Sequence, residues 1–110
     1  MPARRRLSWA PIALDDLEGI LDYLAVNAGS DSAAEIGSRI LAKVDTLTRF
    51  PKRCRVIPEL KRVGVRDFRE LIVGPYRIFF RVDGRIVGIV GVLDGRRDVE
   101  EVLATRGLRG

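Results

Sequence analysis

Three runs of β-forming residues follow one another in the second half of this 110-residue chain. The runs cover residues 68–73, 76–82 and 86–93, with the turn signals Gly74-Pro75 and Asp83-Gly84 between them. An Asp-Gly pair between β-rich runs is a strong hairpin signal, and a type I′ turn there needs positive φ at both central residues. The pattern therefore predicts three consecutive antiparallel strands.

The middle run alternates between two kinds of side chain, which must point to opposite faces of the sheet. One face is uniformly apolar and consists of Tyr76, Ile78, Phe80 and Val82. The other face carries Arg77, Phe79 and Arg81. Because only one face is uniformly apolar, we expect Arg77 and Arg81 to lie on the more accessible side of the sheet.

The first half of the chain contains two apolar stripes with helical spacing. The first begins after Pro11, a residue suited to the first turn of a helix, and stops near residues 27–29. The second follows Ser32 and Glu35, which match a capping box, and continues until Pro51. The short connection over residues 29–31 predicts an antiparallel helical hairpin. Residues 7–9 can form a short strand ahead of it.

Residues 51–67 fit neither period and are punctuated by Pro51, Pro58 and Gly64, so we expect a connecting loop. Its positive charges are Lys52, Arg53, Arg55, Lys61, Arg62 and Arg66. A charge run is usually a solvated surface, although a loop of this length in a small domain is often functional. After residues 94–98, a tight turn, we expect a short helical or loose tail over residues 99–108.

The length predicts a single domain over residues 1–110. A net charge of +5 and a pI near 10.1 favour an anionic partner, although many small soluble domains are simply basic. The single Cys54 forms no internal disulfide, and a chain without histidine has no Cys/His catalytic pair. The basic N-terminus lacks the apolar region of a signal peptide, and no run could span a bilayer, so we expect a cytoplasmic protein without a membrane partner. We predict no cofactor and no metal site.

Four ordered segments carry a resemblance that extends over nearly the whole chain. They are Pro58-Glu59-Leu60, Phe68-Arg69-Glu70-Leu71, Pro75-Tyr76-Arg77-Ile78 and Gly95-Arg96-Arg97-Asp98. In combination with Trp9-Ala10-Pro11 and Phe50-Pro51, they resemble the ParE/RelE superfamily, toxins of type II toxin–antitoxin systems of the plasmid-stabilisation type. The resemblance implies an α+β fold with an N-terminal helical hairpin packed on a small twisted antiparallel sheet. It also implies a cognate antitoxin, a short acidic protein of the ribbon-helix-helix type.

The resemblance leaves two kinds of toxin open. RelE-like members cleave mRNA in the ribosome, whereas ParE-like members arrest growth through DNA gyrase and need not be enzymes. If the chain is a nuclease, the resemblance points to Arg77, with Arg81 and Arg97 as further cations. However, the chain has no histidine, and its tail after Arg97 has no tyrosine, which leaves a poor set of acids and bases at neutral pH. We therefore favour a non-enzymatic ParE-like toxin, with a RelE-like ribosome-dependent mRNA endonuclease as the alternative and a non-toxic basic nucleic-acid-binding module as a third possibility.

The candidate binding residues fall into two overlapping sets. Those expected to contact the target or a nucleic acid are Arg69, Arg77, Arg81, Arg96, Arg97, Lys61 and Arg62. Those expected to contact the antitoxin are Leu17, Leu21, Leu24, Arg77 and Arg81. The simpler interpretation is that Arg69 pairs with a nearby glutamate and Arg97 with Asp94 or Asp98, as exposed ion pairs that contribute little.

Overall fold

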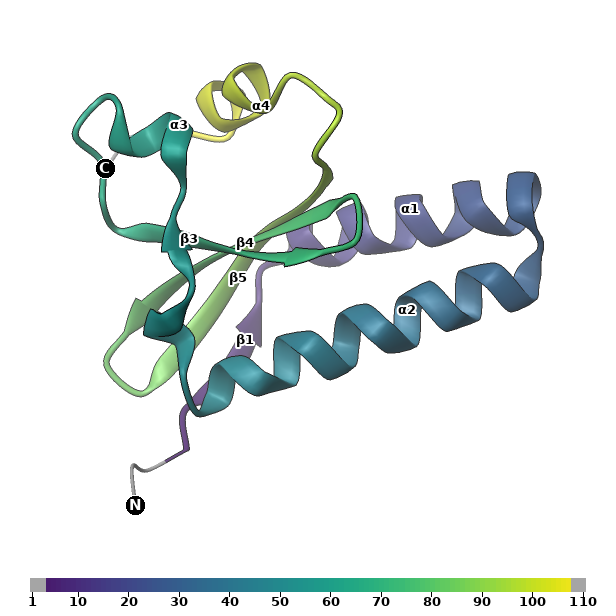
Figure 1. Cartoon of the computed structure of the whole chain (residues 1–110), viewed down its shortest axis with the longest axis horizontal. Helices are drawn as coiled ribbons and strands as arrows, with labels where there is room; N and C mark the ends of the chain where they lie inside the picture. The colour runs from purple at the N-terminus through teal and green to yellow at the C-terminus, as the bar shows by residue number, and fades with distance from the viewer. Residues whose placement is uncertain (1–3, 108–110) are drawn as a thin grey trace.

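A computed structural model describes residues 4–107, which form a five-stranded sheet with helices on both sides (Figure 1). The strand order is β1-β5-β4-β3-β2, where β1 alone runs parallel to its neighbour and the other pairs are antiparallel. The predicted α+β fold is confirmed, with a mixed sheet in place of an antiparallel one. Residues 1–3 and 108–110, which include the start of the basic N-terminus and the end of the predicted tail, lie outside the described residues.

The helical hairpin consists of α1 (Pro11–Ala28) and α2 (Ser30–Asp45), which extend together beyond the sheet (Figure 1). The predicted capping box at Ser32 is wrong, because α2 begins two residues earlier. Gly29 reverses the chain at a φ of +98°, and its carbonyl accepts a hydrogen bond from the Ala33 N–H at 3.1 Å. Ser32 therefore lies inside the first turn. The helices are close where Gly37 faces Leu21, because a Cβ on Gly37 would lie 3.3 Å from Leu21 Cδ1.

The three predicted strands are confirmed as β3 (Phe68–Val73), β4 (Tyr76–Asp83) and β5 (Ile86–Asp94). The predicted type I′ turn at Asp83-Gly84 is wrong by one residue. Asp83 pairs with Ile86, so the central residues are Gly84 and Arg85, and of these only Gly84 has a positive φ, +59°. Glycine at the first central position is what a type II′ turn requires.

The predicted strand at residues 7–9 is β1 (Arg6–Trp9), which pairs with β5 as far as Ile89. Residues 51–67 are not the irregular loop that the sequence suggested. They contain a 3-10 turn at Pro51–Arg53, strand β2 (Arg55–Val56) and helix α3 (Pro58–Lys61). Elements of two and four residues are too short to show a period in the sequence.

The sheet separates two apolar clusters. The larger one lies under the helical hairpin and includes Leu17, Ile40, Ile78 and Phe80. The smaller one lies on the other side, under α3 and α4 (Val99–Thr105), and includes Leu60, Phe79, Leu93 and Leu103. The side of the sheet that carries Arg77 was expected to be accessible, but Phe79 on that side is only 1% exposed because α3 and α4 cover it.

Asp98 begins α4 by accepting a hydrogen bond from the Glu101 N–H at 3.1 Å, as an N-cap residue does. The tail is therefore helical over most of its described length. Among the described residues, no helix is both long and apolar enough to cross a membrane.

An ion pair fixes α4 to the start of the helical hairpin. Asp16 Oδ1 and Oδ2 accept hydrogen bonds from Arg106 Nη2 and Nη1, each at 2.6 Å, and Oδ2 also accepts the Val92 N–H at 3.0 Å. Both charged side chains are more than four-fifths buried, at 13% and 16% exposure. Since β1 stops pairing at Ile89, Asp16 supplies an acceptor that a neighbouring strand would otherwise provide.

We predict that Asp16→Ala lowers the free energy of unfolding by about 2 kcal/mol, because Arg106 and the Val92 N–H lose their acceptor in a largely buried place. Urea unfolding followed by circular dichroism measures the change. The neighbouring Asp15, which is exposed, provides a control, and Asp15→Ala should leave stability nearly unchanged. Equal losses from the two variants would contradict this role of Asp16.

Candidate functional site

Arg77 is the sheet arginine for which the sequence most strongly suggests a functional role. In the structure, two carboxylates bind its guanidinium. Its Nη1 and Nη2 donate to Glu59 Oε2 and Oε1 at 2.8 and 2.7 Å, in a bidentate pair, and its Nε donates to Glu70 Oε1 at 2.7 Å. The guanidinium carbon lies 5.4 Å from the ring centroid of Phe79. Only 12% of the Arg77 side chain is exposed.

Glu70 joins Arg77 to a second arginine. The Glu70 side chain has no exposed surface, and its other oxygen, Oε2, accepts a hydrogen bond from Arg55 Nε at 2.6 Å. Arg55, Glu70, Arg77 and Glu59 thus form a row of alternating charge that runs from β2 across β3 and β4 to α3. We call these four residues the charge row.

The pairing of Arg77 with Glu59 favours the ionised form of both groups. The hydrogen bonds that Arg77 donates lower the pKa of the Glu59 carboxyl below its usual value. The same bonds to Glu59 are the largest cause of a raised pKa of Arg77, and the bond to Glu70 raises it further. Arg77 is therefore a permanent cation, but two carboxylates already neutralise it. In this arrangement its guanidinium has little capacity left for a phosphate.

The turn after β5 is shaped around Arg77. A Cβ on Gly95 would lie 3.1 Å from both Arg77 Cδ and the Pro75 carbonyl oxygen, and the Gly95 N–H donates to that same oxygen at 2.7 Å. The absence of a side chain at Gly95 is what lets the turn pass over the arginine stem. The first residue of the Gly-Arg-Arg-Asp segment thus has a packing role.

The other predicted cations occupy different surroundings and do not converge with Arg77. Arg69 donates to the backbone carbonyl of Cys54 at 2.5 Å, and Arg62 pairs with Glu100 at 3.5 Å. Arg81 is exposed, with its guanidinium carbon 5.9 Å from the ring centroid of Phe68. Lys61 is exposed on α3. Burial raises the pKa of the Cys54 thiol despite the nearby Arg53 and Arg69, so Cys54 is not activated as a nucleophile.

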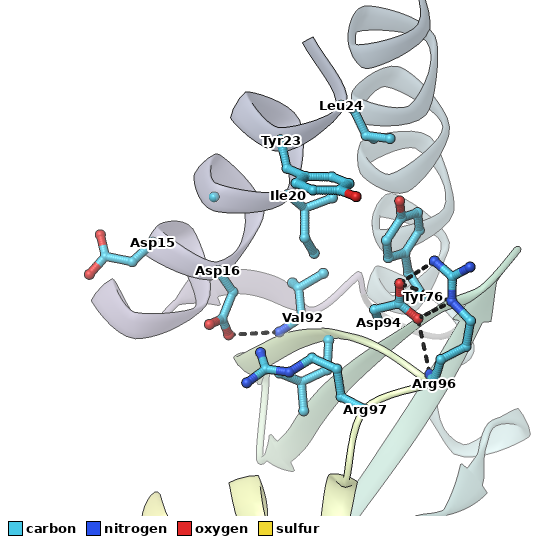
Figure 2. Close-up of a pocket in the computed structure, with 12 residues that line it drawn as sticks. Asp15, Asp16, Ile20, Tyr23, Leu24, Tyr76, Val92, Asp94, Arg96 and Arg97 are labelled. Atoms are coloured by element: carbon cyan, nitrogen blue, oxygen red, sulfur yellow. Dashed lines mark hydrogen bonds and ion pairs between the residues drawn. The ribbon is translucent and has the colours of Figure 1, made fainter. Parts of the chain in front are cut away.

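A cleft of about 470 Å³ lies between α1 and the end of β5 (Figure 2). Side chains of α1 form its apolar wall, where Ile20 and Leu24 are partly buried and Tyr23 is 67% exposed. The turn after β5 forms the opposite wall with Arg96 and Arg97. The cleft therefore offers apolar and cationic contacts side by side. We call it the α1 cleft.

The two arginines of the α1 cleft differ in their partners. Arg96 donates to Asp94 through both its backbone N–H, at 3.0 Å, and its Nε, at 2.9 Å. These bonds, chiefly the side-chain one, lower the pKa of Asp94 to about 2. Arg97 is exposed, and no carboxylate in residues 4–107 forms an ion pair with it. Arg97 is thus the more available positive charge at the cleft.

The leucines expected to contact an antitoxin are unequally accessible. Leu17 is 8% exposed and belongs to the larger core cluster, so its surface is already used by the fold. Leu21 is half-buried against the same cluster, and Leu24 lines the α1 cleft. Of the three, Leu24 is best placed for a partner.

Glu70, Arg55 and Asp16 organise the structure but were not among the residues predicted from the sequence. Glu70 could have been recognised, since it shares a strand face with Phe68 and a carboxylate on a covered face needs cationic partners. Asp16 gave no such signal, because its partner Arg106 is 90 residues away. Within the part of the chain that the structure describes, no group of three or more potential ligand side chains is arranged to hold a metal ion.

Comparison with known proteins agrees with this architecture. Residues 7–99 match the family described as the ParE toxin of the type II toxin–antitoxin system parDE. The chain belongs to the ParE toxin family. No protein of curated function is significantly similar to it in sequence.

Two solved structures share the ParE-type fold of this family member. A chain of the chromosomal ParDE system from P. aeruginosa is 25% identical with a TM-score of 0.68, over 83% of this chain and 96% of its own length. A chain of the RelBE2 toxin–antitoxin complex from Mycobacterium tuberculosis is 18% identical with a TM-score of 0.51, over 81% of this chain and 95% of its own. The second likeness concerns the fold alone.

We predict that Arg77→Ala destabilises this ParE family member by roughly 3–5 kcal/mol, because it leaves the buried Glu70 without one of its two cations. Urea unfolding measures the loss. Arg81→Ala, which removes an exposed arginine from the same strand, is the matched control and should change stability by less than about 0.5 kcal/mol. A free Arg77 with a purely functional role would make the two variants equally stable.

Proposed function

We propose that this protein is the toxin of a type II toxin–antitoxin pair, and that it arrests growth by binding its target rather than by cutting RNA. The family membership supports the toxin assignment. The ParE-like interpretation of the sequence makes DNA gyrase the expected target. The alternative was a RelE-like endonuclease that cleaves mRNA on the ribosome.

The observation that carries the non-enzymatic assignment is the neutralisation of Arg77 by Glu59 and Glu70. Cleavage of RNA through the 2′-hydroxyl needs a base, an acid and cations that stabilise the charged transition state. A guanidinium already bound to two carboxylates is a weak electrostatic catalyst, since a phosphate would have to displace one of them. The chain also has no histidine, and Tyr76 is only 7% exposed.

The α1 cleft supports an antitoxin as partner. Its wall of Ile20, Tyr23 and Leu24 suits the apolar side of an amphipathic segment, while Arg97 suits a carboxylate beside it. Helix α1 itself contains four acidic residues and no lysine or arginine, so an acidic segment would place its carboxylates toward the Arg97 side. This geometry favours one orientation of an acidic, amphipathic antitoxin in the cleft.

We predict that inducing this chain alone arrests bacterial growth with filamentation and DNA-damage signalling, while reporter messages stay intact at early times. Primer extension after induction, together with microscopy, measures both outcomes. Co-expression of the protein encoded beside it should restore growth. Discrete toxin-dependent cuts inside coding sequence would contradict the non-enzymatic proposal, and unimpaired growth at verified expression would contradict the toxin assignment.

We predict that Arg97→Glu weakens binding of the protein encoded beside this chain, and that the loss shrinks as salt is raised. Isothermal titration calorimetry at two salt concentrations measures it. Arg39→Glu makes the same change of charge at an exposed position on α2, away from the cleft, and serves as the control. If the two variants bind equally well, Arg97 is not part of the antitoxin contact.

A further inference from the structure

A group of cations that form no ion pair with a carboxylate of residues 4–107 gathers around the 3-10 turn at Pro51–Arg53. Two adjoining hollows, of about 230 and 300 Å³, share Lys52 in their walls. The cations that line them, which we call the basic end, are Arg5, Arg49, Lys52, Arg53, Arg66, Arg69 and Arg81. Five of the seven are exposed, and Arg5 and Arg69 are half-buried.

The charges of the basic end are not neutralised within the described residues. The ion pairs formed within residues 4–107 all involve arginines outside the basic end. Asp67 is the one carboxylate of these residues that lines either hollow. This contrasts with Arg77, whose charge is fully satisfied by Glu59 and Glu70. A concentration of unpaired cations in a concave surface attracts polyanions from solution.

An exposed aromatic ring distinguishes the basic end from a plain cationic patch. The chain has four phenylalanines, and three of them, Phe68, Phe79 and Phe80, are at most 7% exposed. The fourth, Phe50, is 51% exposed and lines the same hollow as Lys52 and Arg53. The guanidinium carbon of Arg53 lies 5.2 Å from its ring centroid.

The backbone holds Phe50 in place. The following residue, Pro51, is buried and fixes the chain direction, and the Phe50 carbonyl accepts the Arg53 N–H at 3.3 Å. An exposed ring on such a fixed turn costs little ordering entropy when a planar group stacks on it.

We propose that the basic end binds single-stranded nucleic acid, with a base stacked on Phe50 and phosphates beside Lys52, Arg53 and Arg81. Proteins that bind single strands without sequence preference combine an aromatic platform with cations that follow the backbone. An acidic peptide would use the cations but has no need of the ring, and a base pair inside a duplex cannot stack on it. This site is separate from the α1 cleft and does not rest on the proposed toxin mechanism.

Fluorescence anisotropy with labelled mixed-sequence single strands of about 16 nucleotides, RNA and DNA in separate arms, tests the proposal on the purified full chain. Affinity should fall with rising salt, and Lys52→Glu should weaken binding about tenfold at low salt by replacing a phosphate contact with repulsion. Phe50→Ala should weaken it between about fivefold and a hundredfold, the range for loss of one stacked base.

Matched controls separate this site from general effects. Arg39→Glu makes an equivalent charge reversal on α2, and Leu41→Ala truncates a side chain that is 52% exposed, close to the exposure of Phe50. Both should bind within about twofold of the unchanged protein. Phe50→Leu keeps an apolar side chain but has no ring, so its affinity for the single strands should be as low as that of Phe50→Ala. Because leucine is larger than alanine, this variant also tests whether a folding defect explains the loss in Phe50→Ala.

Three results would overturn the proposal. If both Phe50 variants bind the single strands with unchanged affinity, no base stacks on Phe50 and the basic end is only an electrostatic patch. A polyglutamate peptide of equal charge that binds as tightly as the single strands would indicate an acidic protein partner. Tighter binding of the matching duplex would place the ligand among double-stranded nucleic acids.

Discussion

Glu70 is a carboxylate with no exposed surface in the middle of a sheet strand, and burying such a charge is costly unless cations and hydrogen bonds compensate it. Two arginines do so here, one from each neighbouring strand. Arg77 then reaches beyond the sheet to Glu59 on α3. Satisfying one buried charge therefore fixes β2, β3, β4 and α3 relative to one another. The segment over residues 51–67 is held by these contacts as well as by its buried side chains Ile57, Leu60 and Val65.

This use of Arg77 redistributes the positive charge that is open to partners. The charge of Arg77 is neutralised within the fold, whereas Arg97 and the cations of the basic end form no ion pairs with carboxylates of residues 4–107. Arg97 adjoins the apolar wall of the α1 cleft, and the basic end surrounds Phe50. A protein partner and a nucleic acid would thus contact different regions of the same molecule, and the two contacts need not compete.

The strands at residues 68–93 and the helical hairpin could be predicted because their periods extend over many residues and each stripe had one buried face. The errors have local causes. Ser32 looked like a cap only because the sequence does not reveal that Gly29 turns the chain in a single residue. Arg77 looked accessible because strand alternation assigns a face but does not say what covers it. Its carboxylate partner Glu59 lies 18 residues away on a four-residue helix that no periodicity could reveal.

The pairing of Asp16 with Arg106 also bears on how the chain folds. The ion pair joins residues that are 90 positions apart in the sequence. Contacts of such long range form late in folding, because closing the loop costs the chain conformational entropy. The seven-residue α4 packs mainly through Val99 and Leu103, so it should dock after the sheet and hairpin are assembled and detach before they come apart. In native-state hydrogen exchange we therefore expect α4 to be the least protected cooperative unit. Its transient release would uncover the apolar cluster around Phe79 and Leu93 while the rest of the domain stays folded.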